Sequence, residues 1–152
     1  MFGLFKKEEF KVVSPADGTL VPIDQVPDPT FSMKLMGDGF AVKPANGTIC
    51  SPISGNIVTV FPTGHAVGIK NKDGVECLIH IGLDTVNLNG KGFKTLVGQG
   101  DKVKAGQALV QVDKEALENE GYNLITMVIM TGGYDKPIQI EEKSCTAGEK
   151  IL

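Results

Sequence analysis

The residues best suited to carry out chemistry are the only two histidines of the chain, His65 and His80. A neutral imidazole is a nucleophile near pH 7, because its reference pKa is about 6.5. Two neighbouring imidazoles can share a group transfer, since one attacks an electrophile while the other donates a hydrogen bond to the charge that develops. Thr63, two residues before His65, could accept the other N–H of that ring and fix its tautomer.

Metal binding is the alternative use of two neighbouring histidines. Catalytic zinc takes three protein ligands and structural zinc takes four, so the pair would need Glu76 or Asp84 to form even a partial site. Cys77 is a poor candidate ligand, because it falls on the other face of the strand that carries His80. The residues therefore favour no intrinsic metal site. A partial site of the two histidines with Glu76 or Asp84 remains the alternative.

The strand that must position His80 lies in the segment GVECLIHIGLDTV, residues 74–86. Side chains alternate between the two faces of a strand. One face is wholly apolar and therefore contacts the core; it carries Val75, Cys77, Ile79 and Ile81. His80 falls on the other face with Glu76 and Leu78, so its ring is predicted to point away from the core onto a mixed surface.

The stretch NKDG, residues 71–74, separates this strand from AVGIK and predicts a hairpin, because Asp-Gly between apolar runs is a strong turn signal. A four-residue loop would place His65 directly opposite His80. A loop of Asp73 and Gly74 alone would place the two histidines diagonally on the same face. A three-residue loop would break this parity. Directly opposed residues have Cβ atoms about 4.5–5.5 Å apart, so two imidazoles could meet there. Both registers predict that the two histidines converge on one face of the sheet.

The whole chain has the composition of one soluble globular domain, with 152 residues, 41% hydrophobic and 22% charged. A net charge of −3 gives no electrostatic case for nucleic acid and fits a neutral or basic protein partner better. Three cysteines without a C-x-x-C pair are predicted to be reduced packing residues of a cytosolic protein: Cys50, Cys77 and Cys145. Residues 1–11 have no apolar run long enough for a signal peptide or membrane span, and predict a flexible tail that could be amphipathic.

Short apolar runs separated by 19 glycines and 8 prolines predict an all-β sandwich or barrel. The clearest helix is KEALENE, residues 114–120, which Asp113 can cap and Gly121 can end. Two internal echoes, SPADGTLV from Ser14 with SPISGNIV from Ser51 and GDKVKAGQALV with TAGEKIL, are typical of β-folds made of two similar halves. True duplication stays open.

Four segments from about Val12 onward carry a resemblance to a known family. They are SPADGTLVPIDQVPDPTFSMKLMGDGFAV, SPISGNIVTVFPTGHAVGI, GVECLIHIGLDTVNLNGKGF and GDKVKAGQALVQVD. The pattern G-x-E-x-L-x-H-x-G-x-D-T-V around His80 is highly specific, as is a second histidine fifteen residues earlier. The chain closely resembles the glucose-type enzyme IIA of the bacterial phosphoenolpyruvate-dependent sugar phosphotransferase system.

This resemblance implies one domain over residues 12–152. Its expected fold is a compact antiparallel β-sandwich or flattened barrel of two similar halves, the duplicated hybrid motif, with at most short helices. It also implies that His80 is phosphorylated, that His65 stabilises the phosphoryl group, and that Thr63 orients His65. Partner-binding residues are expected around the pair: Phe31, Met36, Phe61 and Leu78 on an apolar rim, with Asp28 and Asp84 as acidic neighbours.

The expected partners follow from the same resemblance. The phosphocarrier HPr would donate the phosphoryl group, and a cysteine on the IIB domain of a sugar permease would accept it. Cys50, Cys77 and Cys145 match no IIB motif. No cofactor is expected, although His65 and His80 could become zinc ligands shared with a regulated metabolic protein. The expected location is the cytoplasm, with transient contact to the membrane through the permease. Gly64 stands where an asparagine is common in the family.

Two other interpretations fit parts of the sequence. A lipoyl- or biotin-carrier domain would explain GDKVKAGQALV and the faint echo of a methionine-flanked lysine in Met33-Lys34-Leu35-Met36. Its order is wrong, because carriers place the lysine after the glycine-rich segment, whereas Lys34 precedes it. A purely regulatory binding protein is the second alternative, and it is compatible with a phosphoryl carrier because an added phosphate changes the choice of partner.

Overall fold

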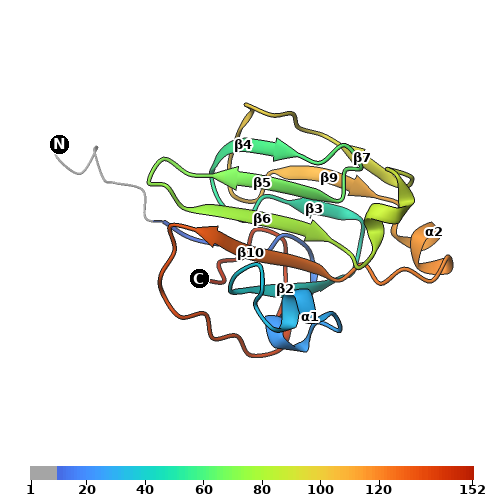
Figure 1. Cartoon of the computed structure of the whole chain (residues 1–152), viewed down its shortest axis with the longest axis horizontal. Coiled ribbons are helices and arrows are strands. Elements are labelled where there is room, and N and C mark those ends of the chain that lie inside the picture. Colours follow the sequence, from blue (N-terminus) through green and yellow to red (C-terminus); the bar gives the residue numbers. More distant parts are fainter. Residues whose placement is uncertain (1–9) are drawn as a thin grey trace.

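The computed structural model describes residues 10–152, which Figure 1 colours along the chain. The tail predicted at residues 1–11 therefore lies outside the described residues, apart from Phe10 and Lys11, which are both exposed.

The fold of residues 10–152 is almost entirely β, with eleven strands and two short α-helices, which confirms the predicted all-β sandwich. The strands are β1 (Gly18–Pro22), β2 (Gly39–Pro44), β3 (Thr48–Cys50), β4 (Gly55–Val60), β5 (Ala66–Lys70), β6 (Glu76–Ile81), β7 (Phe93–Thr95), β8 (Lys102–Val103), β9 (Ala108–Val112), β10 (Thr126–Gly132) and β11 (Lys143–Cys145). Eight form one sheet in the order β11-β1-β2-β10-β6-β5-β4-β8, and three form a second sheet in the order β3-β9-β7. All of these pairs are antiparallel.

The main core fills the space between the two sheets. It joins side chains of the large sheet, such as Leu20, Phe40 and Ile79, to side chains of the small sheet, such as Ile49 and Val110. Each of these residues is at most 2% exposed, and burial of a side chain of this size contributes roughly 1.5–3 kcal/mol. The core therefore fixes the large sheet, including the strand that carries His80.

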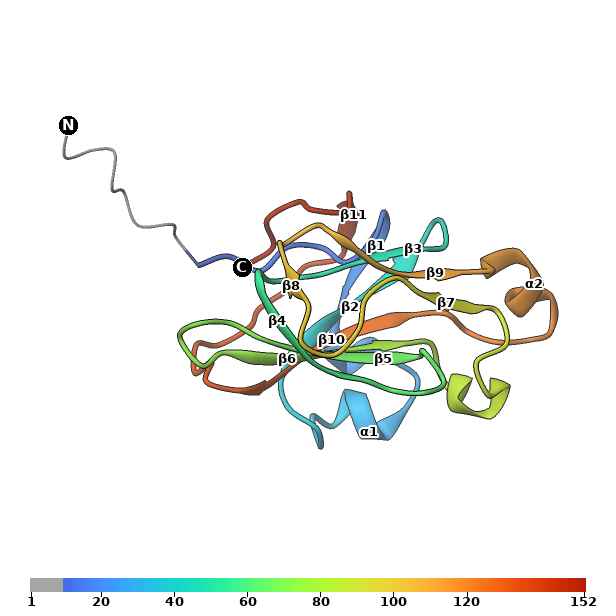
Figure 2. The ribbon, with the colours of Figure 1, turned by 90° about the horizontal axis from the view of Figure 1, so that it is seen from above.

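A second, smaller core lies on the other face of the large sheet. Figure 2 shows the small sheet on one side of the large sheet and α1 (Pro29–Ser32) on the other. The buried members of this second core are Val21, Ile23, Val26, Phe31, Ala41, Ile125, Met127 and Ile129, and Leu78 and Leu83 pack against it. The face predicted to be a mixed surface is thus partly covered by the α1 segment.

The short helices follow their local sequences. Asp28 accepts a hydrogen bond from the Thr30 N–H at 2.9 Å and caps α1, which begins at Pro29. The helix predicted at residues 114–120 is confirmed as α2 (Lys114–Asn119), with Asp113 as its N-cap. The chain leaves α2 through Gly121, whose φ is +93°. Within residues 10–152 no helix is long and apolar enough to cross a membrane.

The two Ser-Pro motifs, whose repetition is typical of a β-fold of two similar halves, make matching contacts. The Ser14 hydroxyl donates to Ala16 C=O at 2.7 Å, and the Ser51 hydroxyl donates to Ile53 C=O at 2.6 Å. The motifs also lie next to each other, since Cys50, which directly precedes the second motif, donates from its N–H to Pro15 C=O of the first motif at 2.6 Å.

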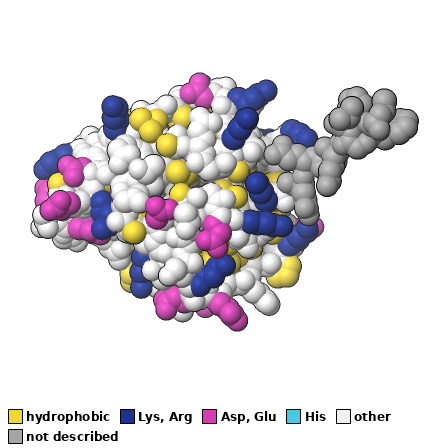
Figure 3. Space-filling model, turned by 180° about the vertical axis from the view of Figure 1, so that it is seen from behind, with side chains coloured by type: hydrophobic (Ala, Val, Ile, Leu, Met, Phe, Trp, Pro, Cys, Tyr) yellow, Lys and Arg dark blue, Asp and Glu magenta, His cyan; other side chains and the backbone are white. Residues whose placement is uncertain are grey.

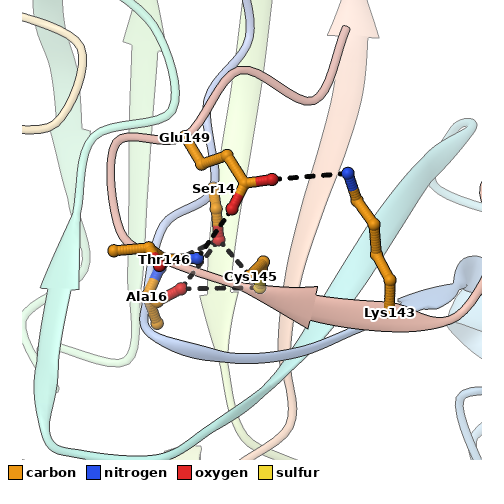
Figure 4. A network of polar contacts seen from close by, with 6 residues as sticks. All are labelled: Ser14, Ala16, Lys143, Cys145, Thr146 and Glu149. Atoms are coloured by element: carbon orange, nitrogen blue, oxygen red, sulfur yellow. Dashed lines mark hydrogen bonds and ion pairs between the residues drawn. The ribbon is translucent and has the colours of Figure 1, made fainter.

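Each motif is further bonded to its own copy of the second echo. Ser14 N–H donates to Glu149 C=O and Ser51 N–H donates to Gln107 C=O, both at 2.8 Å. Figure 4 shows the first copy, in which the Glu149 carboxylate also accepts from Thr146 N–H at 3.0 Å. In the second copy the Gln107 side chain accepts from Lys104 N–H at 3.1 Å.

The three cysteines are packing residues, as the sequence predicts. Cys50, Cys77 and Cys145 are free and buried, and burial raises the pKa of Cys77 to about 12.

Figure 3 shows the molecule from behind, where basic and acidic side chains are interspersed rather than gathered by sign. This face therefore offers no basic patch for a nucleic-acid backbone.

Candidate functional site

His80 is the penultimate residue of β6, and the predicted alternation of this strand is confirmed. Cys77, Ile79 and Ile81 are buried in the main core, whereas Leu78 and His80 are half-buried on the other face. The strand therefore holds the His80 backbone rigidly and directs its ring toward the second core.

The register of the β5–β6 hairpin differs from both predicted registers. Ala66 pairs with His80, and Lys70 pairs with Glu76. His65 consequently lies opposite Ile81, whose N–H donates to His65 C=O at 2.7 Å. Strict alternation would send the His65 side chain to the core face, so the predicted register was wrong.

The physical reason is a three-residue loop, residues 72–74. Asn71 N–H donates to Val75 C=O at 2.9 Å, and the Asn71 side-chain oxygen accepts from Val75 N–H at 2.9 Å. Gly74 supplies the left-handed residue that such a loop needs, with φ of +87°. The asparagine side chain thus closes the hairpin one residue away from where Asp-Gly alone would have closed it.

His65 nevertheless meets His80, because it precedes β5 and is free of the strand's alternation. Phe61 N–H donates to Ala66 C=O at 3.0 Å, and Gly64, with φ of +73°, donates from its N–H to Phe61 C=O at 2.7 Å. This turn directs the His65 ring to the His80 side of the sheet. The two rings meet edge to face with centroids 5.1 Å apart and planes at 80°, so the predicted convergence is confirmed.

A backbone carbonyl determines the tautomer of His80. The His80 Nδ1 lies 3.0 Å from the Gly82 carbonyl oxygen. A carbonyl can only accept, so Nδ1 carries the proton and the neutral ring has its lone pair on Nε2. Burial lowers the pKa of His80 to about 4, and the charge of His65 acts in the same direction, while the Gly82 bond and Asp28 oppose them. The ring is therefore a neutral nucleophile at pH 7.

His65 is more buried than His80, at 4% exposed. Its Nδ1 is hydrogen-bonded to the Thr63 hydroxyl. Burial lowers the pKa of His65 below the ordinary value, so this ring is also neutral at pH 7. Each histidine is thus held at Nδ1 by a residue two positions away, and Nε2 is the remaining ring nitrogen of both.

Two phenylalanines pack against the pair, one on each ring. The Phe31 ring lies 4.9 Å from His80 and the Phe61 ring lies 5.4 Å from His65, between ring centroids. Phe31, expected on the apolar partner-binding rim, is 4% exposed and belongs to the second core, because α1 folds over His80. Leu78 is likewise half-buried against that core. Of the four expected rim residues, Phe61 and Met36 are exposed, at 40% and 39%.

The two expected acidic neighbours differ in their relation to the histidines. Asp28 caps α1, and its charge acts on His80 by raising the pKa of that ring. Asp84 is exposed and takes a left-handed conformation, with φ of 59°, where the chain enters η3 (Thr85–Leu88). Of the two expected acidic neighbours, Asp28 is therefore the one whose charge acts on His80.

Gly82 was missed as a site residue by the sequence reasoning. The signal was the glycine two positions after His80, at the end of the strand pattern. For metal ions, residues 10–152 contain no group of three or more histidine, cysteine, aspartate or glutamate side chains placed to hold one. Within this part of the chain, His65 and His80 therefore have no third side chain placed with them to hold a metal ion.

Comparison with known proteins gives a consistent result. Residues 10–135 match the family model of the phosphoenolpyruvate-dependent sugar phosphotransferase system, EIIA 1. The glucose-specific EIIA component of Halalkalibacterium halodurans is 47% identical over all of this chain and 94% of its own length. The glucose-specific EIICBA component of Streptococcus pneumoniae is 47% identical over 97% of this chain, which corresponds to 20% of that longer protein. The solved glucose permease IIA from Mycoplasma capricolum superposes with a TM-score of 0.88 at 39% identity, covering 95% of both chains.

Proposed function

Since the chain belongs to the EIIA 1 family of the phosphoenolpyruvate-dependent sugar phosphotransferase system, we propose that it carries a phosphoryl group on Nε2 of His80. The donor is phosphorylated HPr and the acceptor is a cysteine of a permease IIB domain. The observation that carries the proposal is the bond from His80 Nδ1 to Gly82 C=O, which leaves a neutral Nε2 lone pair beside a second imidazole.

The first transfer is an in-line displacement at phosphorus. The Nε2 lone pair forms the new P–N bond, the P–N bond of phosphohistidine in HPr breaks, and its electron pair returns to the HPr imidazole. In the second transfer a cysteine thiolate of IIB forms a P–S bond, the His80 P–N bond breaks, and its electron pair returns to Nε2 of the His80 imidazole. Little covalent help is needed in either step, so positioning and charge stabilisation supply most of the catalysis.

His65 supplies that charge stabilisation. A neutral His65 whose Nδ1 accepts from the Thr63 hydroxyl carries its proton on Nε2, and this Nε2–H donates a hydrogen bond to a phosphoryl oxygen on His80. This assignment reverses the direction of the Thr63 bond that was expected from the sequence. A threonine hydroxyl can act in either direction, whereas only the donating hydroxyl leaves a neutral His65 able to stabilise the transferred group.

The exposed apolar residues near the histidines form the docking surface for both partners. Phe61 lies against His65, Met33, Leu35 and Met36 follow the α1 residue that lies against His80, and Val86 follows the Gly82 turn. These five side chains are each at least 39% exposed. Contact with HPr or IIB would remove them from water and keep water away from the phosphoryl group.

The remaining features follow from the relatives. Their names point to a glucose-type permease. The EIICBA relative joins an EIIA-like segment to permease components in one protein, which supports IIB as the partner. The chain acts in the cytoplasm and reaches the membrane through the permease, and transfer of a phosphoryl group from nitrogen to nitrogen and then to sulfur requires no cofactor. Regulation of metabolic proteins, including zinc held by His65 and His80 at an interface, stays a prediction.

A reconstituted relay tests this proposal. The purified chain is incubated with phosphoenolpyruvate, enzyme I and HPr, and its intact mass is followed over time. We expect one acid-labile, alkali-stable phosphoryl group on the wild type and none on His80→Ala, which should stay folded because the ring lies off the main core. The alternative of a lipoyl- or biotin-carrier domain predicts instead a lipoyl or biotinyl adduct on Lys34. Membership of the EIIA 1 family contradicts that alternative. Full labelling of His80→Ala would refute the assignment.

A further inference from the structure

The Gly82 carbonyl, which accepts the hydrogen bond from His80 Nδ1–H, lies directly after the end of β6, where the pairing of β6 with β10 stops. Gly82 pairs with Ile125 of the neighbouring chain segment, and Gly82 N–H donates to Ile125 C=O at 2.9 Å. In a continued antiparallel ladder such a pair exchanges both hydrogen bonds, so Ile125 N–H would donate back to Gly82 C=O. Here Ile125 N–H donates to the Asn123 side-chain oxygen at 3.0 Å. The Asn123 amide thus frees the Gly82 carbonyl for His80.

The same exchange occurs on the other edge of β6. Ile81 N–H donates to His65 C=O at 2.7 Å, and the reciprocal bond would run from His65 N–H to Ile81 C=O. The Ile81 carbonyl instead accepts from the Thr85 hydroxyl at 2.5 Å. Thr85 is completely buried, so its hydroxyl is committed to this bond. One side chain on each edge therefore takes over a bond that the sheet would otherwise make.

Both peptide units around Gly82 are consequently fixed at their two ends. The Ile81–Gly82 unit is held by Thr85 at its C=O and by Ile125 at its N–H. In the Gly82–Leu83 unit, Leu83 N–H donates to Asn123 C=O at 2.9 Å, and Gly82 C=O accepts the hydrogen bond from His80 Nδ1–H. A Cβ on Gly82 would lie 2.5 Å from the Thr85 methyl carbon, so Thr85 also packs directly on this turn.

We infer that Thr85 and Asn123 are positioning residues that hold the Gly82 carbonyl as the acceptor for His80 Nδ1–H. They keep the proton on Nδ1 and the attacking lone pair on Nε2. Neither residue touches the phosphoryl group. The consequence for transfer rate rests on the proposed function, whereas the consequence for the tautomer of His80 does not.

Matched variants separate this role from simple packing. Thr85→Val removes the hydroxyl and keeps the branched shape, while Thr85→Ser keeps the hydroxyl. Asn123→Ala removes the acceptor of Ile125 N–H, while Asn123→Asp keeps an oxygen there. Asn123 is exposed, so its variants should fold even where a change at the buried Thr85 does not. Thermal unfolding identifies the folded variants.

The direct readout is the tautomer of the His80 ring, measured by long-range ¹H–¹⁵N NMR on the full chain. We expect Nδ1–H in the wild type, in Thr85→Ser and in Asn123→Asp, and a measurable Nε2–H population in Thr85→Val and Asn123→Ala. Acceptance from phosphorylated HPr should slow about fivefold to tenfold in the latter two, the effect of losing one ordinary hydrogen bond. Folded Thr85→Val and Asn123→Ala with a wild-type tautomer would overturn the inference. A shifted tautomer in the variants of a chain that accepts no phosphoryl group would support the positioning role and refute the proposed function.

Discussion

The imidazole rings of His65 and His80 meet edge to face, with their centroids 5.1 Å apart. Their Nδ1 partners differ in kind, because Gly82 offers a carbonyl that can only accept, whereas Thr63 offers a hydroxyl that can also donate. The rings are therefore unequal, with His80 suited to attack through Nε2 and His65 suited to donate from Nε2.

This inequality predicts different losses at the two histidines. His65→Gln keeps an N–H donor of similar reach, so acceptance of the phosphoryl group from HPr should persist. Transfer from His80 to a IIB cysteine should slow more, by about 10²–10³-fold, because a hydrogen-bond donor to the charged transition state is misplaced. Single-turnover rates of both steps check this. If His65→Gln blocks acceptance as completely as His80→Ala, the two roles are wrong or reversed.

Thr63 should show a milder form of the same defect. Thr63→Val removes the hydroxyl that orients His65 without removing the ring, so the second transfer should slow by about tenfold or less. Thr63→Ser keeps a hydroxyl and is the matched control. Equal rates for Thr63→Val and the wild type in both steps would show that the hydroxyl has no part in positioning His65.

The pKa of His80 predicts a dependence of stability on pH. Burial lowers it in the folded chain to about 4, whereas the unfolded value is near 6.5. Above pH 6.5 the ring is neutral in both states. Between pH 6.5 and about 4 the unfolded chain binds a proton that the folded chain does not, so the free energy of unfolding should fall, by up to about 3 kcal/mol.

Urea unfolding at a series of pH values measures this change in the free energy of unfolding. The reference is His80→Asn, which lacks the titrating ring and keeps the remaining ionisable groups. The stability difference between the two proteins should decrease from pH 6.5 to about 4 and then level off. A difference that is constant across this range would contradict the depressed pKa.

Gly64 should be sensitive because it combines left-handed backbone with close packing. Its φ is +73°, and an added Cβ would lie 3.1 Å from Phe93 Cβ and 3.2 Å from Thr95 Oγ1. Gly64→Ala should destabilise the fold by about 1–2 kcal/mol and displace the adjacent His65. Gly74→Ala is the matched control, because φ is +87° there and nothing lies within 4 Å of the added atom.

The comparison of these two alanine variants isolates the packing effect. Both should lose stability, but only Gly64→Ala should also slow the transfer from His80 to IIB. Asparagine at Gly64 should be tolerated better than alanine, because asparagine adopts left-handed backbone more readily. Equal transfer rates in the two alanine variants would mean that the Gly64 turn does not position His65.

The alternation that places His80 off the main core was readable from one strand, because period-two patterning depends only on neighbouring residues. The meeting of the histidines was predicted through a register that proved wrong. The actual register depends on the Asn71 side chain closing the loop, and the actual meeting depends on the Gly64 turn. Both are local backbone choices that apolar patterning does not encode.

The burial of Phe31 could not be read from the sequence for a different reason. The α1 segment packs on the large sheet through residues distant in the chain, including Ile125 and Met127. Phe31 was therefore expected only as an apolar residue of the partner-binding rim, whereas it is part of the second core. Gly82 was overlooked because its contribution is a backbone carbonyl, which no side-chain pattern reports.

The central claim is that Nε2 of His80 carries the phosphoryl group. It is tested most directly by ³¹P and ¹⁵N NMR on protein with ¹⁵N-labelled histidine, phosphorylated by enzyme I, HPr and phosphoenolpyruvate. The account predicts one phosphorus signal coupled to Nε2 of His80, with Nδ1 of that ring still protonated and His65 unmodified. A phosphoryl group on His65, or on Nδ1 of His80, would contradict it.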